Sequence, residues 1–329
     1  MEHVETVRGP IATGDLGRVL PHEHLALLGS AGWLSSESAD PRVEVAVRAL
    51  VKASESGVRS LVELTPIGLG RDPVVLRDVA ERTGLNIIVG AAFYLEPYSP
   101  AWAQAAELDE IEATFVREAT VGIDGTDIKV GIFGEQASGL GVITPFEEKC
   151  LRAVARAHRA TGLSINTHCT HGTMPLRQIE ILREEGADLS RVIIGHMDQA
   201  GFDAVLEVVE TGVNVAYDTF GKELWDFVLA PPDRSQQPEG EFAKRAYLRR
   251  DTSRLQEVVE LVRRGYADRV YLSQDMTGLE AYLNPETHGR HGYAYLGNVI
   301  VPALAGLGVP DQAIEQMLVE NPARLLTID

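Results

Sequence analysis

The sequence LGRVLPHEHL occupies residues 16–25 and places two histidines at the end of a predicted β-strand. Alternate residues of a strand point to the same face, so His22 and His24 can bind one cation while Glu23 faces away. A His-x-His pair alone is more often explained by packing or chance. The metal site therefore depends on what the rest of the chain supplies.

Short β-branched or apolar runs alternate along the chain with longer segments of helical periodicity. Helices are predicted at Pro41–Gly57, from the Thr144 cap to Gly162, and at Ser253–Gly265. The alternation predicts an α/β fold, a (β/α)8 TIM barrel formed by residues 1–329 as a single domain. The eight runs predicted to be strands are Arg18–His22, Val58–Leu64, Asn86–Ala92, Asp127–Phe133, Leu163–His168, Arg191–His196, Val213–Tyr217 and Arg269–Ser273.

Composition limits the classes of partner. The formal charge of −18 argues against nucleic acid and anionic membranes, because phosphate contacts need a basic surface. Cys150 and Cys169 are too few for a disulfide framework. Neither a signal peptide nor an apolar stretch long enough to span a membrane is evident, so a cytoplasmic location is expected.

Four further residues that can bind a metal lie in or at the end of later strand candidates: Lys129, His168, His196 and Asp275. The 28-residue step from His168 to His196 is about one βα repeat, so neighbouring strands would present both imidazoles at one rim. Closure of a parallel barrel puts strand eight beside strand one, which brings Asp275 near the first histidine pair. A metal centre is therefore predicted at the C-terminal face of the barrel.

These motifs resemble those of the phosphotriesterase family of the amidohydrolase superfamily, which includes phosphotriesterase-like lactonases. The resemblance covers essentially the whole chain. It is carried by Gly17–Leu25, Gly70–Asp72, Lys129–Gly131, Thr167–His168, Ile194–His196, Ser273–Asp275 and Asn321–Arg324.

The resemblance implies two divalent metal ions, for which imidazole and carboxylate ligands suit zinc, manganese, cobalt or iron. It assigns His22, His24 and Asp275 to the more buried metal, and His168 and His196 to the more exposed one. A hydroxide between the metals would attack the substrate, and Asp275 would accept its proton.

Lys129 is expected to bridge the two metals as a carbamate formed with CO2. An ammonium group would be repelled by the metals, whereas a carbamate is a carboxylate-like ligand. The alternative for Lys129 is a surface lysine that extends its charge into solvent.

Outside the metal ligands, several residues are candidates for contact with the substrate. Tyr94 is similar in position to a tyrosine of family lactonases, although it could be a packed aromatic at the barrel rim. Asp218 is expected to share a proton relay with Asp275. Arg249 and Arg250, and likewise His288 and His291, are candidate substrate-binding residues, with solvated or hydrogen-bonded side chains as the alternative. Two loops, 230–240 and 276–297, would lie at the C-terminal face, and the first is predicted to be mobile.

The substrate is expected to be a small molecule with a carboxylic ester-type bond, and a polar or sugar lactone is favoured. A hydrophilic or anionic substrate is suggested by the cations of the polar loops, which are Lys222, Lys244, Arg245, Arg249 and Arg250. Thr219 follows Asp218 where acyl-homoserine lactonases have an arginine, which argues against a long-chain homoserine lactone. N-acyl amide hydrolysis and phosphotriester hydrolysis are the alternatives. A non-catalytic small-molecule binding barrel is the alternative of another class. The resemblance is compatible with a homodimer, and the sequence shows no decisive interface.

Overall fold

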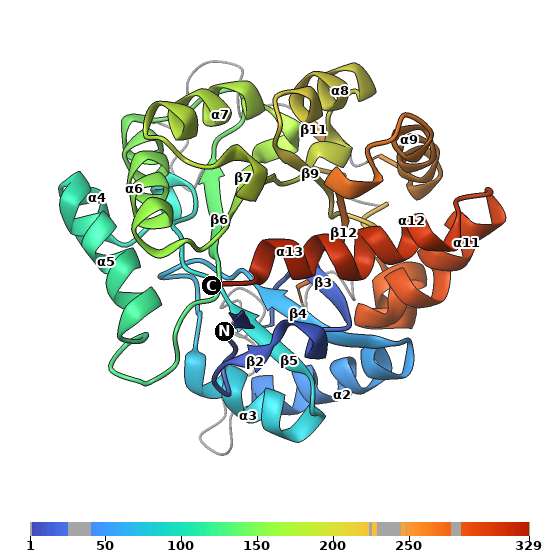
Figure 1. Cartoon of the computed structure of the whole chain (residues 1–329), viewed down its shortest axis with the longest axis horizontal. Coiled ribbons are helices and arrows are strands. Elements are labelled where there is room, and N and C mark those ends of the chain that lie inside the picture. Colours follow the sequence, from blue (N-terminus) through green and yellow to red (C-terminus); the bar gives the residue numbers. More distant parts are fainter. Residues whose placement is uncertain are drawn as a thin grey trace.

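The computed structural model describes residues 2–25, 41–223, 226–228, 245–247, 249–277 and 284–328. A ring of parallel strands lies at the centre, and helices surround it (Figure 1). The strands of the ring are β3 (Arg18–Glu23), β4 (Val58–Glu63), β5 (Asn86–Val89), β6 (Phe133–Ser138), β7 (Ile165–Cys169), β8 (Val192–Ile194), β9 (Asn214–Tyr217) and β12 (Val270–Leu272). The predicted (β/α)8 barrel is confirmed.

Two parallel sheets close into the barrel. One has the order β3-β4-β5 and the other the order β12-β9-β8-β7-β6. A bridge between Gly90 and Ile132 joins β5 to β6. At the other seam the Asp275 N–H donates to the His22 carbonyl (3.1 Å), and the His24 N–H donates to the Met276 carbonyl (3.1 Å). The last strand therefore delivers Asp275 directly beside the first histidine pair.

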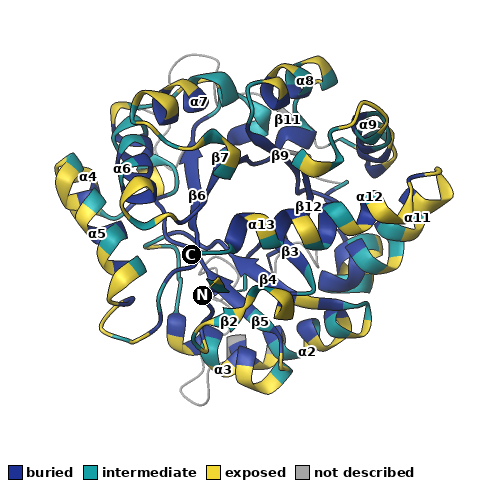
Figure 2. Ribbon diagram, viewed as in Figure 1, coloured by how far each residue is buried: buried dark blue, intermediate teal, exposed yellow. Residues whose placement is uncertain are grey.

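Helices cover the outside of the barrel, with exposed residues on their outer faces and buried ones toward the strands (Figure 2). Helix α6 shows how the sequence sets such an element: Thr144 caps it in a capping box with Glu147, Pro145 begins it, and Gly162 ends it at φ 76°. The helices are α2 (Pro41–Glu55), α3 (Pro73–Thr83), α4 (Ala101–Ala105), α5 (Leu108–Thr120), α6 (Pro145–Thr161), α7 (Pro175–Glu184), α8 (Phe202–Glu210), α9 (Asp251–Arg263), α11 (Val301–Gly306), α12 (Asp311–Glu315) and α13 (Asn321–Leu326).

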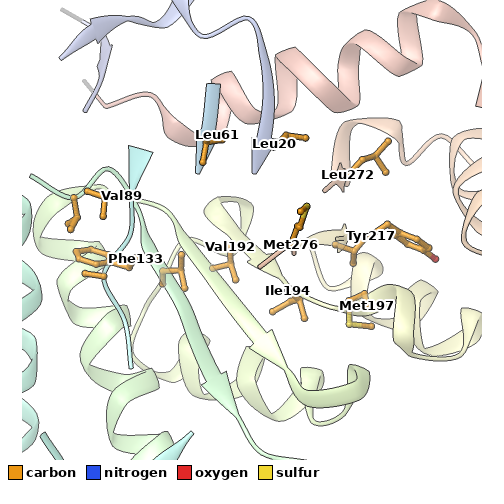
Figure 3. Close-up of a cluster of buried hydrophobic side chains, with 14 of the residues drawn as sticks. Leu20, Leu61, Val89, Phe133, Val192, Ile194, Met197, Tyr217, Leu272 and Met276 are labelled. Carbon is orange, nitrogen blue, oxygen red and sulfur yellow. The ribbon is translucent and has the colours of Figure 1, made fainter. Parts of the chain in front are cut away.

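The apolar core has two parts because each strand has two faces. Leu20, Leu61, Val89 and Phe133 belong to the cluster that includes residues of the surrounding helices (Figure 3). A second cluster consists of residues from alternate positions, such as Val19, Val62, Ile88, Ile193 and Tyr271, and includes Leu325 and Leu326 of α13. Helix α13 crosses the ring of strands in Figure 1. The second cluster therefore fills the barrel interior on the side that α13 covers, and leaves the opposite end of the strands for polar groups.

Short antiparallel strands complete the described chain. β1 (His3–Val4) pairs with β2 (Ile11–Ala12), and His3 also bridges to Ile328 near the C-terminus. β10 (Asp226–Val228) pairs with β11 (Arg245–Tyr247) after the seventh barrel strand. The loop predicted to be mobile, 230–240, lies outside the described residues, as does 278–283 of the second predicted loop. Among the described residues, none of the helices combines the length and apolar character needed to cross a membrane.

The fourth barrel strand differs from its prediction. It spans Phe133–Ser138, whereas the sequence predicts Asp127–Phe133. The apolar residues before Phe133 are extended and partly paired, since the Gly131 N–H donates to the Val89 carbonyl (3.0 Å). The β-branched run thus marks only the entry to this strand. Its C-terminal end is the polar stretch Gly134–Ser138, which apolar patterning does not identify.

Candidate metal centre

The first group of potential ligands lies where β3 meets β12. The Nε2 atom of His24 is 2.9 Å from Oδ1 of Asp275, and Nε2 of His22 is 3.7 Å from the same oxygen. All three side chains have ligand atoms close enough to hold one metal ion. The backbone of Asp275 has φ 47°, a left-handed conformation that is uncommon for a residue other than glycine and is concentrated at functional sites.

Glu135, at the C-terminal end of β6, lies between two pairs of histidines. Its Oε1 is 3.3 Å from Nε2 of His24, and its Oε2 is 3.3 Å from Nε2 of His22. The same Oε2 is 2.7 Å from Nδ1 of His168 and 3.5 Å from Nε2 of His196. One carboxylate therefore faces both the pair at the end of β3 and the second pair, in which His168 lies in β7 and His196 follows β8.

Lys129 does not join this cluster, and the prediction that it bridges the metals is wrong. Its half-buried side chain lies in the extended segment before β6, six residues ahead of Glu135. The next residue, Val130, donates its N–H to the carbonyl of Glu118 in the last turn of α5. The error follows from the predicted strand boundary. The predicted strand ends at Phe133, where the observed strand begins, so Lys129 lies before the strand and not at its C-terminal end. The sequence signal for this position is an acidic residue, Glu135, in the polar stretch Gly134–Ser138 that continues the apolar run.

Asp218, directly after β9, contacts two of the histidines on the side of each ring that faces away from Glu135. Its Oδ1 is 2.9 Å from Nδ1 of His196, and its Oδ2 is 3.0 Å from Nδ1 of His22. It also accepts hydrogen bonds from the backbone N–H of His196 (3.0 and 3.2 Å). The Asp218 oxygens face the ring nitrogens that point away from Glu135, a position that suits an orienting role. The relay with Asp275 stays a prediction.

Glu23 and Glu63 are buried acids that sequence patterning does not single out. Glu23 Oε1 accepts from the Ser273 hydroxyl (2.8 Å) and the Gln274 N–H (3.0 Å), which fixes the chain just before Asp275. Burial raises the pKa of Glu23 to about 7. Glu63 contacts the hydroxyl of Thr65, which lies 3.3 Å from Nδ1 of His24. Both acids act by positioning the groups that face the cluster.

The charges of the cluster are strongly coupled. Burial alone would lower the pKa of His22 and of His196, but neighbouring carboxylates, chiefly Asp218, raise both to about 10. Burial alone would raise the pKa of Glu135, but His168 and His22 hold it well below its usual range. The carboxylates therefore stay ionised, and positive charge between the imidazole rings is needed to balance them.

The cluster fits a pair of divalent cations. Both ring nitrogens of His22 are buried, and neither makes an aligned hydrogen bond to any residue that the structure describes. Nε2 of His22 faces Glu135 and Asp275 without an aligned hydrogen bond, which suits a nitrogen that binds a metal. Four imidazoles with carboxylates facing both pairs form a donor set typical of zinc, manganese, cobalt or iron.

Only some of the predicted substrate-binding residues lie near the cluster. Tyr94 lies at the cluster, with its ring centroid 4.9 Å from that of His168. Arg249 instead pairs with Glu257 of α9 and donates to the Ala200 carbonyl (2.7 Å). Its guanidinium is thus held at the outer helix, and the solvated or hydrogen-bonded alternative fits it better.

The remaining predicted contacts also differ from one another. Arg250 is exposed just before α9. His291 is half-buried, with its ring 5.7 Å from that of Tyr295. His288 is 1% exposed and its Nε2 lies 2.8 Å from the Phe220 carbonyl. Of these residues, only His288 packs on the segment that follows β9, next to the cluster.

The sequence model of the phosphotriesterase family matches residues 2–326. The chain belongs to the phosphotriesterase family. It is 31% identical to the Escherichia coli phosphotriesterase homology protein, whose structure, complexed with phosphate in its active site, matches with a TM-score of 0.79 over 95% of this chain and 99% of that one. A mutant of a Deinococcus radiodurans PTE-like lactonase matches at 29% identity and a TM-score of 0.81, over 98% and 99%.

Among relatives compared by sequence, the N-acetyltaurine hydrolase of Dictyostelium discoideum is 35% identical over 289 residues, which is 87% of this chain and 74% of the relative. Membership of the phosphotriesterase family makes this chain a metal-dependent hydrolase that acts on small molecules. The phosphotriesterase-family chain therefore has the predicted class of activity. The bond that it cleaves is a separate question.

Proposed function

We propose that the protein is a binuclear metal-dependent hydrolase that cleaves a carboxylic ester-type bond, most specifically that of a lactone. His22, His24 and Asp275 would hold one cation, His168 and His196 would hold the other, and Glu135 would contact both. The observation that carries this proposal is the position of Glu135. Its Oε1 faces His24, and its Oε2 faces His22 together with His168 and His196, so one carboxylate contacts both histidine pairs, as a bridging group requires.

When bound, the two cations would supply a water of lowered pKa as nucleophile and would polarise the carbonyl of the substrate. Asp275 accepts the proton of that water, because its carboxylate lies beside His24 at the centre, with Oδ1 2.9 Å from Nε2 of that ring. The same carboxylate then returns the proton to the leaving group. Asp218 keeps the rings of His22 and His196 oriented throughout.

Tyr94 is placed to contact the substrate. Burial, followed by the charge of Glu135, raises the pKa of its phenol well above the usual value, so the O–H remains protonated. A protonated phenol beside His168 can donate a hydrogen bond to the carbonyl oxygen of a bound substrate and stabilise the oxyanion that forms there.

A lactone is supported by the structural likeness to a PTE-like lactonase over nearly the whole chain. A cyclic ester also presents an exposed carbonyl and needs little assistance for its leaving group. The second candidate is an N-acyl amide, supported by the relatives described as N-acetyltaurine hydrolases. The same arrangement serves both reactions, and the amide makes the stronger demand on proton delivery by Asp275.

The test is hydrolysis by the zinc- or manganese-reconstituted protein of a panel of sugar, aliphatic and homoserine lactones, followed by proton release. N-acyl amides are assayed beside them by release of the free amine. We expect turnover of one polar lactone class and at least a 1000-fold loss in Asp275→Asn, since removal of a proton acceptor and ligand affects both roles. A panel in which amides alone react would replace the lactone by the amide, and silence across the panel under every metal would contradict hydrolysis.

Several finer predictions belong with this proposal. Zinc, manganese, cobalt and iron all suit the donor set, so metal identity stays open among them. The carbamate is not proposed, because Glu135 is the group that contacts both histidine pairs. A single domain over residues 1–329, a homodimer and a cytoplasmic location stay predictions.

A further inference from the structure

A buried lysine lies at the metal centre in addition to the proposed ligands. Lys222 follows β9, its side chain is 7% exposed, and its ammonium contacts Oδ2 of Asp275. The other oxygen of the carboxylate faces His24. The ammonium is therefore separated from the histidine cluster by the width of one carboxylate.

The segment that carries Lys222 is fixed by its backbone. The Gly221 N–H donates to both oxygens of Asp251 (3.0 and 3.2 Å), and the Gly221 carbonyl accepts from the Thr287 hydroxyl (2.6 Å). The Phe220 carbonyl lies 2.8 Å from Nε2 of His288. Gly221 has φ 92°, and a Cβ there would lie 2.3 Å from His288, so only glycine fits.

A fully buried arginine joins these supports. The Arg254 Nε lies 2.9 Å from Asp198, and its Nη1 donates to Asp251 (2.7 Å). Its Nη2 donates to the Thr219 hydroxyl (2.9 Å) and to the Lys222 carbonyl (3.4 Å). Buried ion pairs contribute little net stability, and they are used where a geometry must be specified. Here the geometry specified is that of the segment which aims Lys222 at Asp275.

The charge balance of the centre favours an additional anion. Glu135, Asp218 and Asp275 are the acids that contact the histidines. Two divalent cations would be balanced by these three carboxylates and the hydroxide nucleophile, which leaves the charge of the Lys222 ammonium without an equivalent anion at the centre. A substrate with a negative group placed at Lys222 would offset that charge in a site from which water is largely excluded.

We propose that Lys222 is a specificity-determining residue that binds an oxyanion group of the substrate, a carboxylate, sulfonate or phosphate. This inference rests on the proposed hydrolytic function and narrows its substrate class. Because Lys222 is one carboxylate width from the cluster, the anionic group and the scissile carbonyl must be separated by only a few bonds. An ammonium suits this role, since it binds an oxyanion as a point charge without a fixed orientation.

The test uses two matched substrate pairs. The first is 5-oxotetrahydrofuran-2-carboxylate and its carboxamide, and the second is N-acetyltaurine and its sulfonamide. Each pair keeps the scissile bond and differs in one charge. We expect the protein to favour the acidic member at least 10-fold in kcat/KM. Lys222→Met should lower kcat/KM for the acidic member at least 10-fold more than for the neutral one, chiefly through KM, and Lys222→Arg should restore part of the preference.

Two measurements separate binding from structural roles. Metal content by mass spectrometry should be equal in the protein and in Lys222→Met, and calorimetric binding of the product 2-hydroxyglutarate should weaken at least 10-fold in the variant. Lys52→Met, on the exposed face of α2, is the control and should keep the preference of the unaltered chain. Equal losses for both members of a pair, an unchanged preference, or a loss of metal in Lys222→Met would each overturn the assignment. Failure of the unaltered protein to hydrolyse any ester or amide would instead refute the proposed function.

Discussion

At the scale of single residues, the site is organised around carboxylates that contact imidazoles from opposite sides. Glu135 faces the ring nitrogens that point into the cluster, and Asp218 faces those that point away from it. The inward nitrogens are free to bind metal only if the outward ones are held in one tautomer and orientation. The two acids therefore have different functions although both are buried.

Asp218→Asn should weaken metal binding by about 10–100-fold, because an amide supports the imidazole ligands less well than a carboxylate. The measurement is zinc affinity by competition with a chromophoric chelator. Asp203→Asn, an exposed position on α8, is the matched control and should bind zinc like the unaltered chain. Equal affinities in the two variants would show that Asp218 does not orient the ligands.

At the scale of elements, a connection between barrel strands contains a buried histidine whose pKa depends on packing and not on the metal centre. His158, in the last turn of α6, has its Nδ1 2.6 Å from the Leu163 carbonyl, and its Nε2 accepts from the Asp188 N–H (3.1 Å). It joins the end of α6 to the segment before β7 and to the turn before β8. The acceptor role of Nε2 requires a neutral ring. Burial accordingly lowers the pKa of His158 below its ordinary value of 6.5.

The free energy of unfolding should therefore fall as the pH drops below about 6.5, because the unfolded chain then binds a proton that the folded chain resists. The contribution of His158 is fully present above that pH and is lost as the pH falls through the lower pKa of the folded state. Urea unfolding between pH 7.5 and 5 measures this dependence. His158→Gln, which cannot titrate, should flatten it, and parallel curves for the two proteins would count against the assignment.

Element boundaries also explain what the sequence could and could not predict. The sequence predicts five of the residues at the centre because each stands at the end of an apolar run or in a motif. They are His22, His24, His168, His196 and Asp275. Glu135 was missed because its strand continues into polar residues, where an apolar pattern carries no information. Lys222 was visible only as one cation among several in a polar stretch, since burial and its contact with Asp275 depend on tertiary structure.

At the scale of the whole molecule, the proposed ligands come from β3, β6, β7, the residues after β8 and those after β12. These elements belong to both sheets, so the cluster exists only when the barrel is closed. The interior of the barrel explains why the site lies at one end. Apolar residues and α13 fill the other end, and polar side chains gather where the strands stop. Chain topology thus brings together residues more than 250 positions apart, such as His22 and Asp275.

The central claim is that Glu135, and not Lys129, joins the two metals of a hydrolytic centre. The most direct measurement is the number of metal ions per chain, by mass spectrometry, in the zinc-reconstituted protein and in Glu135→Gln and Lys129→Ala. We predict that the unaltered protein and Lys129→Ala bind both metals, and that Glu135→Gln binds one or none because an amide cannot bridge two cations as a carboxylate does. Full occupancy in Glu135→Gln together with a loss in Lys129→Ala would contradict this account.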